Sequence, residues 1–297
     1  MGAHHARVMQ TSRARLGVVV DRHRERAERL ARRAGCPASD RLEDAFGCDA
    51  AIVAAPAEHH AEIALALLEA GRPVLVEKPM ADELVDVRRI LDVSERSGVP
   101  VMCGFVERFN PAVAAAAALL NEAPVHMIAV RHSPPVPRIR TSVVHDLLIH
   151  DIDLAVRFAG GVSIERIAGL ATAPAGSSSH EQADCILGFA DGAIANLSAN
   201  RVSQRKVRTF AIQTPSLLID IDLARQEVVV CRHGIEDSGG SPDRTGNAVD
   251  VPPVRPIEPL ARQLTYFLAL AEGQEDADGE RRQLLPSHVA AARLLEP

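Results

Sequence analysis

Three residues of this chain have the types and spacing needed to exchange a proton with a hydroxyl group. Lys78 directly follows Glu77 at the end of the apolar run 73–76. Asp146 and His150 lie four residues apart, so on a helix they share one face. A lysine, a carboxylate and a histidine can together bind a hydroxyl group and take or return its proton. The pattern therefore predicts an enzyme.

Strand-like and helix-like segments alternate through the first third of the chain, which predicts a parallel, doubly wound sheet. Lys78 follows one of these strands, and the carboxyl ends of the strands are where such sheets bind ligands. The apolar strand segments are 15–20, 49–56, 73–76 and 99–103, and the helical segments are 23–34, 58–70 and 82–97.

The pattern changes after Gly104, where strands of β-like composition follow one another with few helices between them. This predicts a mostly antiparallel sheet in an α+β domain, so we expect two domains, 1–104 and 105–297. Residues 232–256 are rich in Gly, Pro, Ser and Asp, which predicts a loop. The expected strands are 125–132, 164–171, 183–190, 193–199, 209–213, 216–222 and 227–230, and the expected helices are 111–121, 142–159, 258–272 and 286–296.

The composition excludes several classes of protein. The chain has 297 residues with a net charge of -6 and only 3% aromatic residues, so we expect no nucleic-acid partner. No apolar run is long enough to span a membrane. The five cysteines form no C-x-x-C motif, which favours reduced thiols in a cytoplasm over disulfides or a zinc site.

The start of the chain lacks the usual opening of a dinucleotide-binding domain, which is a strand, a G-x-G-x-x-G loop and a helix. We expect the first strand to be missing and Gly2 to be at most the last glycine of the loop. Asp21 follows Gly2 by 19 residues, close to the spacing of an acid that binds the adenosine ribose. Either the start is set too late, or the domain lacks the N–H groups that bind the pyrophosphate.

With these motifs in view, the chain resembles the Gfo/Idh/MocA family of glucose–fructose oxidoreductase and inositol dehydrogenase, as an N-terminally truncated member. The resemblance implies a Rossmann domain, a second domain that binds substrate and forms oligomer contacts, and hydride transfer between nicotinamide and a hydroxyl of a sugar, nucleotide-sugar or cyclitol. The motifs that carry it are Met1–Arg7, Ala54-Ala55-Pro56, His60, Glu77-Lys78-Pro79, Arg108-Phe109-Asn110-Pro111 and the D-x-x-x-H-D-x-D segment 146–153.

The resemblance also implies roles for individual residues. Lys78 matches the lysine that approaches the reacting hydroxyl and the nicotinamide ribose of the cofactor, His150 the acid/base histidine, and Asp146 the carboxylate one turn before it. Asp21 matches the acid that binds the ribose of NAD, whereas Arg22 next to it suits the 2′-phosphate of NADP. Further residues matched to positions near the cofactor are Gly2, His5, Ala55, Pro56, His60 and Glu77.

Other roles stay open at this point. Arg108 and Asn110 either bind substrate or anchor the junction of the domains. Asp153 shares the face of Asp146 and is expected to make structural hydrogen bonds, while His145 and Asp151 are expected to point away from the site. The motif order is most similar to the branch that oxidises nucleotide-linked amino sugars, and a homodimer or homotetramer is expected.

Two alternatives to a dehydrogenase are consistent with the same residues. A chain without the first strand could serve as a non-catalytic, dimerising or regulatory paralogue that has lost cofactor binding. The histidine and aspartates of segment 146–153 could instead hold a metal in a lyase or hydrolase, although no H-E-x-x-H motif or cysteine pair accompanies them.

Overall fold

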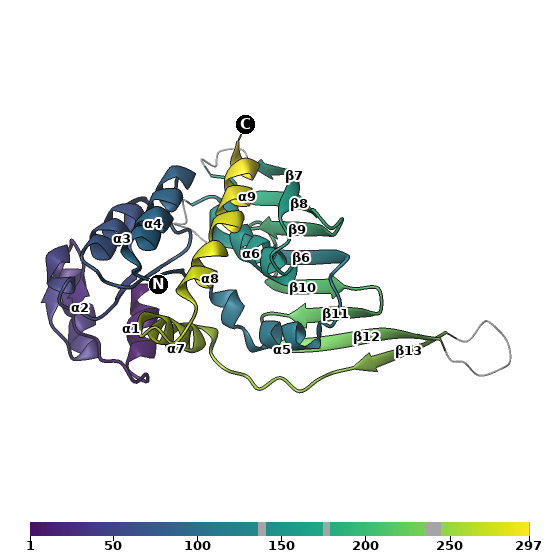
Figure 1. Ribbon diagram of the computed structural model, residues 1–297, viewed down its shortest axis with the longest axis horizontal. Coiled ribbons are helices and arrows are strands. Elements are labelled where there is room, and N and C mark those ends of the chain that lie inside the picture. The colour runs from purple at the N-terminus through teal and green to yellow at the C-terminus, as the bar shows by residue number, and fades with distance from the viewer. Residues whose placement is uncertain (136–140, 175–178, 236–244, 297) are drawn as a thin grey trace. The chain divides into compact units, whose positions relative to one another are not determined.

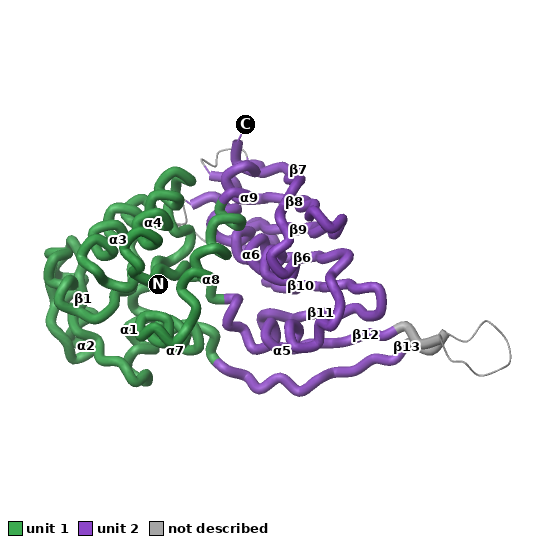
Figure 2. The backbone as a smooth tube through the Cα atoms, in the orientation of Figure 1, with its two compact units in different colours: residues 1–106, 258–288 green, residues 107–257, 289–297 purple. Residues whose placement is uncertain are grey.

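The computed structural model describes residues 1–135, 141–174, 179–235 and 245–296 (Figure 1). The chain forms two compact units (Figure 2). The first unit contains residues 1–106 and 258–288, and the second contains residues 107–257 and 289–297. A segment from the end of the chain therefore belongs to the first unit, and the last helix, α9 (Leu285–Leu295), runs from the first unit into the second.

The first unit has the alternating strands and helices that the sequence predicts. Its parallel strands form two ladders, one of two strands and one of three. The strands are β1 (Val19–Val20), β2 (Ala38–Ser39), β3 (Ala51–Val53), β4 (Val74–Val76) and β5 (Val101–Cys103), and the helices are α1 (Gly2–Met9), α2 (Arg24–Ala34), α3 (His60–Glu69), α4 (Leu84–Ser97), α7 (Pro259–Ala271) and α8 (Ala277–Arg282), with short 3₁₀ turns at Leu42–Ala45, Ala57–His59 and Val106–Phe109.

Burial explains why these short strands form. All three residues of the central strand β4 and of its neighbour β5 are buried, as expected for parallel strands covered on both faces. Gly35 and Gly98 end α2 and α4 in the left-handed conformation, with φ of 70° at both, which glycine adopts without steric cost. The predicted parallel strands are confirmed. Along the chain, helix α1 is the first described element of this unit.

Some predictions for the first unit were wrong in detail. The apolar run 15–20 forms only the two-residue strand β1, which pairs with β2, a strand that the composition did not indicate. Helix α8 was also missed, because its sequence is charged and shows no apolar stripe. Among the described residues, no ladder hydrogen bonds join β1 to β3, so the sheet stays in two pieces.

The second unit is built on one eight-stranded sheet, which confirms the predicted α+β domain. Its order is β13-β12-β11-β10-β6-β9-β8-β7, and every neighbouring pair is antiparallel except β6 and β9. The strands are β6 (His126–His132), β7 (Ile164–Thr172), β8 (Gln182–Phe189), β9 (Ile194–Asn200), β10 (Val207–Gln213), β11 (Leu217–Asp222), β12 (Glu227–Ile235) and β13 (Thr245–Asp250), and the helices are α5 (Pro111–Leu119) and α6 (Ile149–Phe158), preceded by a π-helical turn at Val144–Leu148.

The loop predicted over 232–256 was wrong at residues 232–235 and 245–250, which are strand, whereas 251–256 form neither a helix nor a strand. β12 continues to Ile235, and β13 pairs with it from Thr245 to Asp250 (Figure 1). Cross-strand pairing satisfies the backbone groups of these residues whatever their composition, so local composition was a poor guide. Residues 236–244 of the predicted loop lie outside the described residues.

One face of this sheet is covered by helices and the other is exposed. Helix α5 contacts β11 and β12, and α6 contacts β6 and β9. Alternation along each strand places Met127 and Phe210 in the core beneath the helices, whereas Ile128 is 44% exposed on the opposite face. The helix-covered face is the one that positions the candidate site residues of this unit.

Candidate active site

The turn that carries Lys78 is fixed by backbone hydrogen bonds at the end of β4. The N–H of Glu77 donates to the Val53 oxygen at 2.9 Å, and the N–H of Gly104 donates to the Val76 oxygen at 2.7 Å. These bonds tie the end of β4 to both neighbouring strands, so the lysine follows a rigid element. The Lys78–Pro79 peptide is cis, and the Lys78 side chain is partly exposed.

A buried histidine and glutamate flank this turn. Nε2 of His5, in α1, lies 2.6 Å from Oε1 of Glu77, and both side chains are almost fully buried. The second carboxylate oxygen of Glu77 accepts the Lys78 N–H at 3.3 Å. A Cβ added at Gly104 would lie 2.9 Å from that same oxygen, so only glycine fits beside the carboxylate without displacing it. Glu77 therefore links α1 to the lysine turn.

His60 holds the lysine turn from its other side. Its Nδ1 lies 2.8 Å from the Pro79 oxygen, and its Nε2 lies 2.9 Å from the Ala55 oxygen. The ring joins the turn after β3 to the turn after β4. His60 is thus placed to position Lys78, and Ala55 contributes its backbone rather than its side chain.

The residues expected to bind the ribose lie at the end of β1. Oδ1 of Asp21 accepts the His23 N–H at 2.8 Å, while the Asp21 backbone N–H donates to Ser39 at 3.1 Å. Oδ2 of Asp21 has no hydrogen-bond partner among the described residues. Arg22 is directed toward Nε2 of His59, at 3.2 Å. This arrangement leaves a carboxylate oxygen of Asp21 available to a ligand.

Gly2 is the first residue of α1, and its surroundings do not require a glycine. A Cβ added there would meet the Cβ of Ala54 at 3.9 Å, an ordinary van der Waals contact. The packing within the chain therefore gives no independent support to the view of Gly2 as part of a glycine-rich loop. Pro56 follows the same strand and precedes the turn 57–59.

In the second unit, Asp146 and His150 lie at the start of the covering helix, but that helix does not begin as predicted. A π-helical turn occupies Val144–Leu148, and the N–H of Ile149 bonds to the Val144 oxygen five residues back. The α-helix α6 begins only at Ile149. Single π turns are frequent at functional sites, because they reorient the side chains around them.

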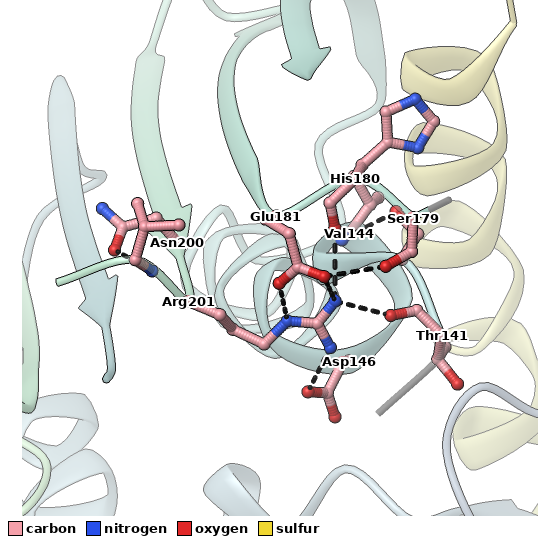
Figure 3. Close-up of polar contacts among 10 residues, drawn as sticks. Thr141, Val144, Asp146, Ser179, His180, Glu181, Asn200 and Arg201 are labelled. Carbon is pink, nitrogen blue, oxygen red and sulfur yellow. Dashed lines mark hydrogen bonds and ion pairs between the residues drawn. The ribbon is translucent and has the colours of Figure 1, made fainter. Parts of the chain in front are cut away.

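Asp146 is held by an arginine that the sequence did not indicate (Figure 3). Arg201 follows β9, is only 2% exposed, and donates to Oδ2 of Asp146 at 3.2 Å. Its guanidinium also bonds both carboxylate oxygens of Glu181, at 2.8 and 3.2 Å, and the backbone oxygens of Thr141 and His180, at 2.8 and 3.2 Å. Arg201 thus joins the helix start to the beginning of β8 and the end of β9.

A second buried arginine forms a similar group beside the first. Arg131, in β6, bonds both oxygens of Asp151, at 2.9 and 2.7 Å, and Oε1 of Glu107 at 2.9 Å. Asp151, which was expected to point away from the site, lies in this buried ion pair. Burial acts to raise the pKa of Glu107, but the charge and hydrogen bond of Arg131 and the amide of Asn110 outweigh it, so the pKa is lowered.

Arg108 and Asn110 make buried structural contacts. Arg108 donates to both oxygens of Asp153, at 2.7 and 2.6 Å, which also confirms the structural hydrogen bonds expected of that aspartate. Oδ1 of Asn110 caps α5 through the Ala112 N–H at 3.1 Å, and its amide donates to Glu107 and to the Leu223 oxygen. All of these contacts lie within the second unit, and substrate binding by Arg108 and Asn110 stays a prediction.

Two further observations concern the described residues alone. No three His, Cys, Asp or Glu side chains in them gather as metal ligands would. None of the helices in this part of the chain is both long and apolar enough to cross a membrane.

Comparison with protein families matches both units. Residues 1–105 match the family GFO_IDH_MocA, described as an oxidoreductase family with an NAD-binding Rossmann fold. Residues 126–214 match the GFO/IDH/MocA C-terminal domain.

Curated relatives of the chain are named as dehydrogenases. The myo-inositol dehydrogenase Hyg17 of Streptomyces leeuwenhoekii is 39% identical over 163 residues, and this match spans 50% of each chain. The UDP-N-acetylglucosamine 3-dehydrogenase of Acidithiobacillus ferrooxidans is 25% identical over 285 residues, which are 95% of this chain and 87% of the relative. The match therefore covers about half the length of one relative and most of the other.

Solved structures share the fold over nearly the whole chain. The UDP-N-acetylglucosamine 3-dehydrogenase GnnA from Acidithiobacillus ferrooxidans superposes with a TM-score of 0.87 at 24% identity, covering 99% of this chain and 96% of that one. A levoglucosan dehydrogenase in complex with NADH and levoglucosan gives a TM-score of 0.79 at 19% identity, with 98% and 92% coverage. At these identities the likeness shows the fold.

Proposed function

The chain belongs to the GFO/IDH/MocA oxidoreductase family, and on that premise we propose that it transfers hydride between nicotinamide and a secondary hydroxyl of a sugar, nucleotide-sugar or cyclitol. The observation that carries the proposal is the rigid placement of Lys78 at the carboxyl end of β4 in the family's NAD-binding domain. We propose that residues 1–104 bind the cofactor and that residues 105–297 bind the substrate and form the oligomer contacts.

The residues of the first unit fit a dinucleotide. Asp21 has a carboxylate oxygen available at the carboxyl end of a parallel strand, as required to accept hydrogen bonds from ribose hydroxyls. We propose NAD as the preferred cofactor. NADP can also bind, because the neighbouring Arg22 cation suits its 2′-phosphate. Gly2, His5, Ala55, Pro56, His60 and Glu77 complete the proposed cofactor side of the site.

Oxidation of a secondary alcohol removes a hydride from the carbinol carbon and a proton from its oxygen, leaving a ketone. The nicotinamide is the hydride acceptor, and side chains of the protein accept the proton. His150 is the proposed base that takes the hydroxyl proton, and Asp146 is the carboxylate that stabilises its protonated form. Lys78, as a cation, stabilises negative charge developing on the oxygen or relays the proton.

Replacing Lys78 tests the role that the proposal gives it. Lys78→Met should lower kcat by a factor of about 10²–10³, because a charge aimed at the developing oxyanion is lost. Its affinity for NADH, measured by calorimetry, should stay near that of the wild type. Arg89→Met, which removes an exposed cation from α4, is the matched control and should leave both quantities unchanged. Near wild-type turnover in Lys78→Met contradicts the role.

Replacing His150 tests the assignment of the base. His150→Asn should remove the limb of the pH–kcat profile that reports the base, with UDP-N-acetylglucosamine and myo-inositol as the substrates tried. His180→Asn is the control, because the His180 ring points away from Arg201 in Figure 3. A profile in His150→Asn that matches the wild type excludes His150 as the base. A wild-type chain that binds no NADH and reduces no NAD favours the non-catalytic alternative.

We also propose that the chain forms a homodimer or homotetramer through the exposed face of its large sheet. Ile128, Ile186 and Ile194 are 44%, 49% and 44% exposed there, on neighbouring strands. Ile128→Asp should lower the mass measured by light scattering, and an unchanged mass argues against this face as the interface. A cytoplasmic location is proposed from the cysteines, which are free in the structure.

A further inference from the structure

Three arginines lie side by side at one end of the helix-covered face of the large sheet. Arg131 in β6 is the direct cross-strand partner of Arg208 in β10. On the other side of β6, Arg131 pairs with Ala199 of β9, and Arg201 follows two residues later on the same face. Arg201, Arg131 and Arg208 therefore project from three adjacent strands into the same region.

Two of these arginines are matched by two carboxylates each, and the third is not. Asp146 and Glu181 neutralise Arg201, and Asp151 and Glu107 neutralise Arg131.

Among the described residues, the ion pair of Arg208 is a 3.7 Å contact with Oε1 of Glu107. That same oxygen already accepts a hydrogen bond from Arg131 at 2.9 Å, and Oε2 is bonded by Asn110. The guanidinium of Arg208, 35% exposed, has no carboxylate of its own.

Lys206 adds a second cation beside Arg208. Lys206 directly precedes β10, and Arg208 is the second residue of that strand, so the two cations lie close together. The charge of Arg208, with burial second, lowers the pKa of Lys206, and burial and the charge of Arg131 lower the pKa of Arg208. Among the described residues, Arg131 and Arg201 each donate hydrogen bonds to two carboxylates, whereas no hydrogen bond joins Lys206 or Arg208 to one.

Arg208 lies close to a candidate catalytic residue of the same unit. Asp146 is near enough for its negative charge to raise the pKa of Arg208 against the effect of burial. The side chain of Arg208 is also partly exposed, so a ligand has access to it. An anionic group bound here would give the guanidinium of Arg208 the hydrogen bonds that its shared 3.7 Å contact with Glu107 does not provide.

We propose that Lys206 and Arg208 bind the diphosphate of a nucleotide-linked sugar substrate. The proposal rests on the proposed function and selects, among its substrate classes, the nucleotide-sugars over neutral sugars and cyclitols. The planar guanidinium of Arg208 can bond two phosphate oxygens at once, and the Lys206 ammonium supplies a mobile second charge. Arg131 and Arg201, already matched by carboxylates, position the region and do not touch the ligand.

Binding of UDP to the full-length chain tests the site. Calorimetry is carried out with NADH at saturation, so that the pyrophosphate site of the cofactor is occupied. Arg208→Gln and Lys206→Gln should each weaken UDP binding about tenfold or more, because each removes a charge-assisted hydrogen bond. Arg205→Gln removes an exposed cation from the same turn and should bind UDP as the wild type does. Glucuronate, titrated in parallel, should bind far more weakly than UDP.

Labelling the lysines provides a second readout that needs no variant. Only two of the 33 lysine and arginine residues are lysines, Lys78 and Lys206, so each acylated lysine is assigned unambiguously by peptide mass. UDP should protect Lys206 from an acylating reagent and should leave Lys78 as reactive as before. If UDP protects Lys206 in the wild type but not in Arg208→Gln, both residues bind the same ligand.

The outcomes separate this inference from the proposed function. Equal UDP affinity in Arg208→Gln and the wild type, or unchanged labelling of Lys206 by UDP, overturns the site. Glucuronate binding as tightly as UDP overturns the assignment to a diphosphate. If the chain binds NADH and oxidises myo-inositol but does not bind UDP, the inference fails and the proposed function stands. If it binds UDP at Lys206 but neither binds NADH nor reduces NAD, the proposed function fails.

Discussion

The two units hold their candidate site residues by different means. In the first unit, Lys78 sits on a turn fixed by strand hydrogen bonds, by His60 between two backbone oxygens and by one buried histidine–glutamate contact. In the second unit, Asp146 is held by Arg201, whose guanidinium bonds two carboxylates and two backbone oxygens. Backbone geometry places the lysine, whereas buried charge places the aspartate.

The energetic consequences of the two designs differ. A buried ion pair gains little net free energy over an apolar replacement, because burying the charges costs about as much as their attraction returns. Removing one partner alone is costly, because the other charge stays buried without compensation. The second unit should therefore tolerate loss of a single charged side chain far less well than the first.

Loss of Arg201 should have the largest effect. Arg201→Met should lower the free energy of unfolding by about 3–5 kcal/mol, because Asp146 and Glu181 stay partly buried without their cation. Arg201→Lys should recover little of this, since an ammonium cannot bond all the acceptors of the guanidinium fork. The measurement is urea denaturation, with the exposed Arg205→Met as control. A loss below about 1 kcal/mol in Arg201→Met would show that the pairs are readily rearranged.

The corresponding change in the first unit should cost less. Glu77→Gln keeps the shape and one acceptor for His5, so it should lower the free energy of unfolding by about 1–2 kcal/mol. The same denaturation experiment applies. If Glu77→Gln destabilises the protein as much as Arg201→Met, the distinction between backbone-held and charge-held sites is wrong.

Acid should act on the second unit through Glu107. Its folded pKa is lowered, because Arg131 and Asn110 outweigh the effect of burial. The unfolded chain therefore binds the proton more tightly, so the stability that Glu107 contributes is present above its unfolded pKa and is lost as pH falls through the folded pKa. Unfolding free energies measured from neutral to acid pH should fall less steeply in Glu107→Gln, even though this variant is less stable at neutral pH. An equally steep fall in both proteins would assign the acid sensitivity to other groups.

The same contrast explains what could be predicted from the sequence. The parallel strands and the lysine turn were predicted, because apolar runs, glycine stops and the Glu77-Lys78-Pro79 motif are local. Arg201 and Glu181 lie 55 and 35 residues from Asp146 and have no motif, and only the pairing of β8 with β9 brings them together. The π turn at Val144–Leu148 likewise leaves no sequence signal, since its apolar spacing fits an ordinary helix.

Loss of an exposed ion pair should have the smallest effect. Such a pair also separates the contribution of interatomic distance to stability from the contribution of burial. Arg13 and Glu272, both in the first unit, are 2.7 Å apart, closer than the 3.2 Å between Arg201 and Asp146. Their side chains are 55% and 45% exposed, so water already solvates both charges and salt screens their attraction. Arg13→Met should change the free energy of unfolding by less than about 0.5 kcal/mol. A loss comparable to that in Arg201→Met would mean that proximity, and not the burial of an uncompensated charge, sets the cost in both units.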